Sequence, residues 1–177
     1  IAYLQSRYIY PIPNELKPVA YYTTTGRKLY GVGIKTLNSG WVIRQTTDKA
    51  VNEEVSKYIF SGGADISYWE GNNDVVIIVE GMFDAGAVRL LEKTKNNIIV
   101  LNSVSNYKKA IEFINQNKFK KIVLALDNDG PGTETSKKIR ELLKGTVEVE
   151  EFKYTGKDLN EYLIIKSQNT RKNTLKP

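Results

Sequence analysis

The chain has 177 residues, 41% of them hydrophobic, with 26 Lys and Arg against 20 Asp and Glu. This length and composition fit one folded domain with at most a small appended subdomain, and they exclude a wholly disordered chain. No apolar run approaches the ~20 residues of a membrane-spanning helix, so we expect no membrane protein. The sequence begins at Ile1, so we expect a fragment excised from a longer polypeptide or a processed chain, and it shows no secretory leader, so we expect a cytoplasmic location.

Cysteine and histidine are both absent. Their absence excludes disulfide frameworks, zinc fingers, Ser-His-Asp triads and imidazole bases. Any metal that this chain binds must therefore be held by oxygen ligands, which favours Mg²⁺ or Mn²⁺.

The net charge of +6 is unevenly distributed along the chain. Residues 1–47 hold six basic side chains and one acidic side chain, and residues 163–177 hold four basic side chains and no acid. The segment between them is slightly acidic. Basic flanks around an acidic middle favour a polyanionic partner beside a metal-binding centre, and a solvated lysine-rich surface is the simpler alternative.

The first third of the chain is rich in short β segments. Three prolines predict an extended or irregular path over residues 7–18. β-Branched and aromatic residues between turn signals predict an antiparallel meander, with strands over 19–23, 28–35 and 41–45. A short helix is predicted over 52–58. We therefore expect a small basic β subdomain over residues 1–70.

From residue 71 onward, apolar runs alternate with amphipathic segments. The runs predict buried strands over 75–79, 98–101, 121–126 and 147–152. The amphipathic segments predict helices over 84–91, 108–117, 134–143 and 158–165. This alternation is typical of an α/β fold with a mostly parallel sheet, which we place at residues 71–166. Residues 167–177 are polar and basic, and we expect a frayed tail or a linker there.

Acidic residues follow three of the predicted parallel strands. Glu80 and Asp84 follow the first, Asp127 and Asp129 follow the third, and Asp158 follows the fourth. Ligands of open parallel sheets gather beyond the carboxyl ends of the strands, so these carboxylates should converge. A single acid at such a place is usually a helix N-cap, and Asp158 before Leu159 fits that role too. Several acids close together favour a bound cation, because a cation among them relieves the repulsion between their like charges.

The same residues resemble a known family. Val79-Glu80-Gly81 with Asp84, followed by the segment 126–132 (LDNDGPG), strongly resembles the TOPRIM domain. The segment 156–163 (GKDLNEYL) resembles the third acidic motif of primase-type TOPRIM domains. Segments 26–35 and 40–44 are similar to the basic β region that precedes TOPRIM in phage, plasmid and bacterial DNA primases.

This resemblance implies a Rossmann-like TOPRIM fold and the catalytic core of a primase, which makes RNA primers on single-stranded DNA. It implies that Glu80, Asp127 and Asp129 hold Mg²⁺ or Mn²⁺, with Asp84 and Asp158 as outer or second-metal acids. It implies that the template–primer backbone or the incoming triphosphate is contacted by Arg27, Lys28, Lys35, Arg44 and, in the third motif, Lys157. The implied partners are single-stranded DNA, ribonucleoside triphosphates and a replicative helicase.

Three other functions use a similar pattern of acids. A TOPRIM nuclease would use the same carboxylates with water in place of a 3′-hydroxyl, and a non-catalytic nucleic-acid-binding module would keep them without a reaction. A receiver-type phosphate-binding domain also clusters acids at strand ends, but the Glu80 motif and the Asp-x-Asp pair fit it poorly.

Overall fold

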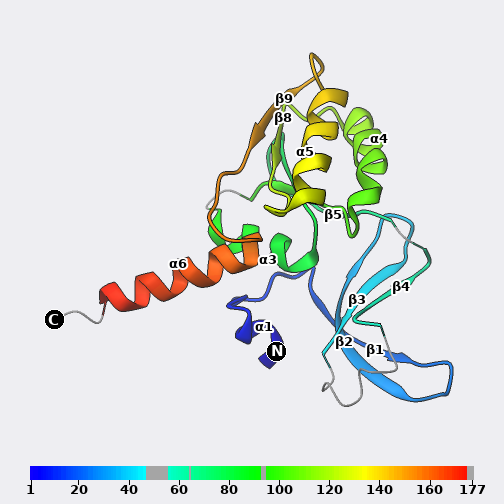
Figure 1. Cartoon of the computed structure of the whole chain (residues 1–177). Helices are drawn as coiled ribbons and strands as arrows, with labels where there is room; N and C mark the ends of the chain where they lie inside the picture. The colour runs from blue at the N-terminus through cyan, green and yellow to red at the C-terminus, as the bar shows by residue number, and fades with distance from the viewer. Residues whose placement is uncertain (47–55, 64, 93–94, 175–177) are drawn as a thin grey trace.

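The computed structural model describes residues 1–46, 56–63, 65–92 and 95–174 (Figure 1). An antiparallel four-stranded sheet forms the N-terminal part, in the order β1-β2-β3-β4. Its strands are β1 (Lys17–Tyr22), β2 (Lys28–Lys35), β3 (Trp41–Gln45) and β4 (Tyr58–Ser61). The predicted meander is confirmed, and β2 and β3 have the predicted bounds.

A five-stranded sheet follows, in the order β5-β7-β6-β8-β9. Its strands are β5 (Ser67–Trp69), β6 (Val75–Val79), β7 (Asn97–Val100), β8 (Lys121–Leu124) and β9 (Glu148–Glu151). All neighbours pair in parallel except β5, which runs antiparallel to β7. The predicted α/β architecture with a mostly parallel sheet is therefore confirmed.

Helices cover both faces of this second sheet. On one face lie α3 (Met82–Leu91) and α6 (Leu159–Thr174), and on the other lie α4 (Tyr107–Asn117), preceded by the 3₁₀ turn η1 (Val104–Asn106), and α5 (Gly130–Leu142) (Figure 1). Successive residues of β6 serve opposite faces, because strand side chains alternate. Ile77 and Val79 pack in the core beneath α3 and α6, whereas Val76 and Ile78 pack beneath α4 and α5.

The N-terminal segment, residues 1–16, packs into the core beneath α3. It contains the short helix α1 (Ala2–Ser6), and its side chains Leu4, Ile9 and Leu16 are buried. Ile9 and Leu16 lie so close to Gly86 of α3 that an added Cβ there would stand 3.1 Å from the Ile9 Cδ1 atom. A glycine inside a helix costs about 1 kcal/mol relative to alanine, and here it admits this close packing.

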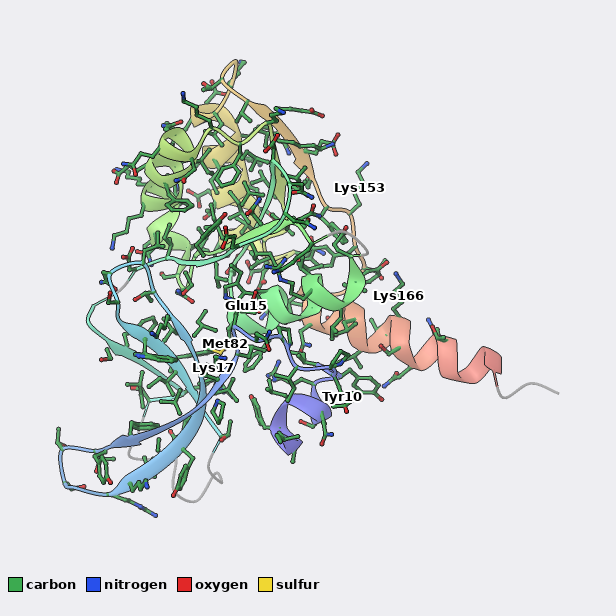
Figure 2. The ribbon with its side chains drawn as sticks, turned by 180° about the vertical axis from the view of Figure 1, so that it is seen from behind. Tyr10, Glu15, Lys17, Met82, Lys153 and Lys166 are labelled. Atoms are coloured by element: carbon green, nitrogen blue, oxygen red, sulfur yellow. The ribbon has the colours of Figure 1, made fainter. Side chains whose placement is uncertain are left out.

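The same core also contains Val32, Ile34 and Val42 from the first sheet. The four-stranded sheet and the α3–α6 face of the second sheet therefore share one apolar interior, which fixes their relative position. Figure 2 shows Glu15 beside α3, where its carboxylate pairs with Arg89 at 3.3 Å.

Several local predictions need correction. Tyr58, predicted as the end of a helix, begins strand β4, while residues 52–55 of that predicted helix lie outside the described residues. β5 was not predicted, since three residues give too short a pattern. α5 begins at Gly130, four residues before the predicted start, because Asp129 caps it and Pro131 fits a first turn. α6 continues to Thr174, through a segment expected to be frayed or a linker. No helix among the described residues is long and apolar enough to cross a membrane.

Candidate metal and nucleotide site

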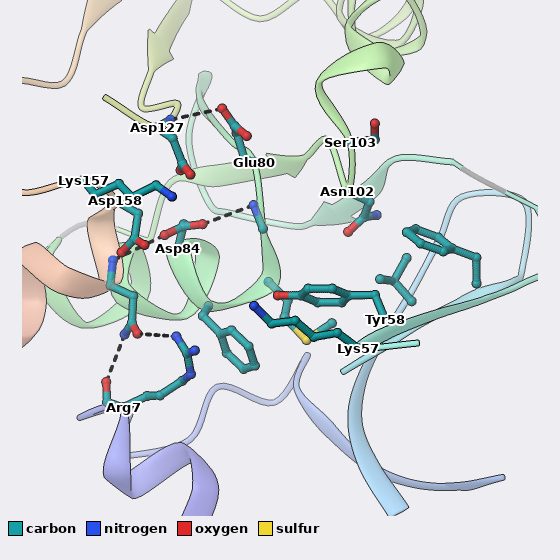
Figure 3. A pocket seen from close by; sticks show the side chains of 16 residues that line it. Arg7, Lys57, Tyr58, Glu80, Asp84, Asn102, Ser103, Asp127, Lys157 and Asp158 are labelled. Atoms are coloured by element: carbon teal, nitrogen blue, oxygen red, sulfur yellow. Dashed lines mark hydrogen bonds between the residues drawn. The ribbon is translucent and has the colours of Figure 1, made fainter. Parts of the chain in front are cut away.

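The carboxyl ends of β6 and β8 bring two acids together. Glu80 comes directly after β6, and Asp127 lies three residues after the end of β8, the parallel neighbour of β6. The backbone N–H of Asp127 donates a hydrogen bond to the Oε1 atom of Glu80 at 3.2 Å. The two predicted ligands therefore meet at one edge of the sheet (Figure 3).

A cavity of about 380 Å³ opens beside this pair. It lies between the second sheet and the first, so its walls come from both parts of the chain. Its acidic residues are Glu80, Asp84, Asp127 and Asp158, and its basic residues are Arg7, Lys57 and Lys157. Tyr58 and Phe60 of β4 supply an aromatic wall, of which Figure 3 labels Tyr58. A space of this size with convergent charged groups is suited to a small polar ligand.

Burial and mutual repulsion perturb the acids of the cavity. The pKa of Glu80 is raised to about 7, mainly by burial and then by the charge of Asp127. The pKa of Asp127 is raised to about 6, mainly by burial and then by the charge of Asp158. Lys157 opposes both shifts. The pair of carboxylates is therefore short of positive charge, which is the condition that a bound cation would relieve.

Asp84 is the most deeply buried acid of the group. Its side chain belongs to the first turn of α3, and the residue is 8% exposed. One carboxylate oxygen accepts the N–H of Gly81 at 3.2 Å and the other accepts the N–H of Asn160 at 3.3 Å. Burial is the main cause that raises its pKa to about 8, followed by the charges of Asp127 and Asp158. Asp84 thus joins the N-termini of α3 and α6.

Comparison with protein families identifies this region. The Toprim-like family matches residues 77–163, a span that includes most of β6, all of β8 and the first turn of α6. These residues form a TOPRIM domain. The family resemblance drawn from the acidic motifs is thereby confirmed. No curated protein matches the sequence.

Solved structures extend the likeness to nearly the whole chain. The primase fragment of the bacteriophage T7 primase-helicase is 16% identical, with a TM-score of 0.60, and the match covers 98% of this chain and 68% of that one. A DNA primase domain from Pseudomonas aeruginosa is 14% identical, with a TM-score of 0.52, and the match covers 89% of this chain and 56% of that one.

A third match is a structure of T7 lagging-strand DNA polymerase with primase domains bound to an RNA/DNA hybrid and dTTP. It is 16% identical, with a TM-score of 0.59, and the match covers 88% of this chain and 80% of that one. At these identities the likeness establishes the fold, including the β subdomain ahead of the TOPRIM domain.

Two of the predicted TOPRIM acids also cap helices. Asp129 accepts the N–H of Gly132 at 3.0 Å and so caps α5, and it is not among the described residues that line the cavity. Asp158 accepts the N–H of Glu161 at 2.7 Å in the first turn of α6 while it lines the cavity. Within the described part of the chain, no three acids are placed so that together they could hold a metal ion.

The predicted basic residues lie in three different settings. Lys157 lines the cavity. Arg27, Lys28 and Lys35 are exposed on the four-stranded sheet, outside the cavity lining, with Lys28 over the ring of Tyr30 and Lys35 over that of Trp41. Arg44 of β3 has its guanidinium 5.1 Å from the Tyr58 ring centroid, next to the aromatic wall.

The sequence analysis missed several residues of the cavity wall, among them Arg7, Lys57, Tyr58 and Asn160. Lys57 and Tyr58 escaped notice because the segment was predicted as a helix end. Had the meander been extended by one strand, Tyr58 would have been placed opposite Arg44, where the register puts it. Arg7 gives no local signal, because its partner Asn160 lies 153 positions away.

Proposed function

We propose that this chain is the catalytic core of a DNA primase, which extends RNA primers on a single-stranded DNA template by metal-dependent nucleotidyl transfer. The observation that carries the proposal is the half-buried Glu80–Asp127 pair, which lines one cavity together with Lys157, Lys57 and Arg7. Acids alone would suit a cation, whereas acids opposite several cations suit a cation together with a phosphate-bearing ligand.

The donor set fits Mg²⁺ or Mn²⁺. The chain contains no histidine or cysteine, and the anionic side chains among the described residues that line the cavity are the carboxylates of Glu80, Asp84, Asp127 and Asp158, which offer hard oxygen ligands. Mg²⁺ is commonly held by one or two carboxylates, with water and substrate phosphates completing its shell, so Glu80 and Asp127 suffice on the protein side. When bound, such an ion neutralises the negative charge that develops in phosphoryl transfer.

The other residues of the cavity suit a nucleoside triphosphate. In the proposed reaction the 3′-hydroxyl of the primer attacks the α-phosphorus, a new P–O bond forms, and pyrophosphate leaves. Lys157 and Lys57 offer ammonium groups for the phosphates, and the Tyr58 and Phe60 rings offer an apolar surface for the ribose or base. Most of the rate in such a site comes from positioning and charge neutralisation, so a histidine base is not required.

The template would lie on the basic four-stranded sheet. Arg27, Lys28 and Lys35 are exposed there, and phosphate neutralisation by such residues dominates the affinity for nucleic acid. The third structural match contains primase domains bound to an RNA/DNA hybrid and dTTP, which supports both the proposed template surface and the proposed triphosphate site. A replicative helicase as partner and a cytoplasmic location belong to the same proposal.

A primer-synthesis assay tests the proposal against its two alternatives. The chain is incubated with single-stranded DNA, labelled ribonucleoside triphosphates and Mn²⁺, and both labelled RNA and DNA cleavage are measured. We expect metal-dependent RNA oligomers that Asp127→Asn abolishes, while the surface control Asp74→Asn leaves them unchanged. Metal-dependent DNA cleavage without RNA would establish the nuclease instead. DNA binding without either reaction would leave a non-catalytic module.

A further inference from the structure

The N-terminal segment reaches the cavity through one side chain. Arg7 follows α1, and its Nη1 atom donates to the Asn160 Oδ1 atom at 2.8 Å, while the Asn160 Nδ2 atom donates back to the carbonyl oxygen of Arg7 at 2.9 Å. The Arg7 Nε atom donates to the Tyr3 hydroxyl at 3.2 Å, and the guanidinium lies 4.4 Å from the ring centroid of Phe83. The guanidinium is thus held by contacts to α1, α3 and α6.

The partner of Arg7 is a buried residue at the start of α6. Asn160 is 2% exposed and lies in the first turn of the helix, two residues after the cap residue Asp158. Its backbone N–H donates to Asp84, which also accepts the N–H of Gly81 next to Glu80. A continuous chain of hydrogen bonds therefore runs from Arg7 through Asn160 and Asp84 to the end of β6 (Figure 3).

The same turn needs this support. Four acids line the cavity, and their like charges favour separation of the elements that carry them. When both are ionised, Asp84 on α3 and Asp158 directly before α6 repel each other, which acts to push the first turn of α6 away from α3. The two-way bond between Arg7 and Asn160 opposes that movement, since a buried amide with both its groups paired is costly to pull apart.

We infer that Arg7 is a positioning residue of the cavity: through Asn160 it fixes the first turn of α6, and with it the places of Asp84 and Asp158, for cation and triphosphate binding. This inference deepens the proposed function and rests on it for its ligand. It assigns the N-terminal segment a part in the site in addition to its part in the core.

Arg89 provides a matched control. It also ties the N-terminal segment to α3, through Glu15, and it donates to the carbonyl oxygens of Glu70 and Asn96. It does not line the cavity. Arg89→Ala should therefore lower the melting temperature as Arg7→Ala does, without any effect on ligand binding.

Two variants of Arg7 distinguish the effect of its hydrogen bonds from the effect of its positive charge. Arg7→Ala removes the whole contact set, whereas Arg7→Lys keeps the positive charge but cannot bond Asn160 and Tyr3 together in the same geometry. If Arg7 acts through Asn160, both variants weaken Mn²⁺ binding measured by calorimetry, by about tenfold as found for other residues that orient metal ligands. Asn160→Ala should do the same, and the Arg7→Ala/Asn160→Ala double variant should be no weaker than either single variant.

A measurement without metal completes the test. Backbone amide exchange followed by NMR should show faster exchange at Asn160 and Glu161 in Arg7→Lys and unchanged exchange there in Arg89→Ala. Unchanged exchange in Arg7→Lys would overturn the inference, as would wild-type Mn²⁺ affinity in that variant or additive effects in the double variant. If the wild-type chain itself binds no Mn²⁺, the proposed function fails, and the exchange data still decide whether Arg7 holds the turn.

Discussion

Replacing Glu80 by glutamine should make the metal-free protein more stable. Glutamine has nearly the same shape, and its Oε1 atom can still accept the N–H of Asp127, so the substitution removes charge and little else. Raising a carboxyl pKa from its ordinary 4.5 to about 7 corresponds to about 3.4 kcal/mol, at 1.36 kcal/mol per pKa unit. Because Glu80 is partly exposed and solvent screens its charge, we expect about 1–2 kcal/mol in practice.

The size of this effect depends on pH. The folded protein holds a proton on Glu80 more tightly than the unfolded chain, so Glu80 favours folding below pH 4.5 and loses that contribution as the pH rises through about 7. Urea unfolding in EDTA should therefore show Glu80→Gln above wild type at pH 8, with a smaller difference at pH 5. Glu134→Gln, at an exposed glutamate of α5, should show no such gain.

Addition of Mn²⁺ should reverse the order of the two proteins. A ligand that binds only the folded state stabilises it according to its concentration and affinity, and only wild type retains the full carboxylate pair. If Glu80→Gln is less stable than wild type in EDTA at pH 8, then Glu80 has a structural role and the reasoning is refuted. If Mn²⁺ stabilises both proteins equally, the ion binds elsewhere.

Three further outcomes follow from the same geometry. Calorimetry should show tighter Mn²⁺ binding as the pH rises from 5.5 to 8, because protons compete for carboxylates with pKa values of about 6 and 7. Gly132→Ala should abolish Mn²⁺ binding, since its Cβ would lie 2.2 Å from the carbonyl oxygen of Asp127, whereas the control Gly130→Ala, whose Cβ meets nothing within 4 Å, should bind normally. The double substitution Arg27→Ala/Lys28→Ala should lower the salt dependence of single-stranded DNA binding, measured by fluorescence anisotropy, by up to about one unit of slope per lost phosphate contact.

The parallel sheet and its acidic edge were predictable because they depend on local patterns. β6 is a run of five apolar residues, and Glu80 follows it immediately, so strand and ligand could be read together. In the same way, β8 is a mostly apolar segment with Asp127 shortly after it, so this strand and its acid could also be predicted together. The rule that parallel strands end at a common edge then brought the two acids together without knowledge of the intervening chain.

The rest of the cavity depends on contacts between distant segments. β5 has three residues and no apolar run, and its place in the second sheet comes from pairing with β7. Arg7 and Lys57 come from the N-terminal segment and from the approach to β4, which reach the TOPRIM acids only when the two sheets share a core. Gly132 lies in α5, where its missing side chain admits close contact with the Asp127 backbone from the neighbouring loop.

An acid at the end of a strand can serve as a helix cap or as a ligand for a cation, and the hydrogen bonds of the structure help to tell these roles apart. Asp129 and Asp158 accept N–H groups at the starts of α5 and α6, and Asp84 accepts one at the start of α3, so capping accounts for part of what each of them does. It does not account for Glu80 and Asp127. Glu80 stands ahead of α3, and no described residue donates a hydrogen bond to the Asp127 carboxylate.

Glu80 and Asp127 are therefore the acids that helix capping does not explain, and their presence calls for a functional reason. A capping aspartate adds about 1 kcal/mol to stability, so its presence has a local reason. A half-buried carboxylate pair with raised pKa values lowers stability at neutral pH, and proteins keep such groups where binding or catalysis requires them. The Glu80–Asp127 pair is therefore the part of the site with the strongest physical case for a cation. The capping residues Asp84, Asp129 and Asp158 fix the starts of α3, α5 and α6 around that pair.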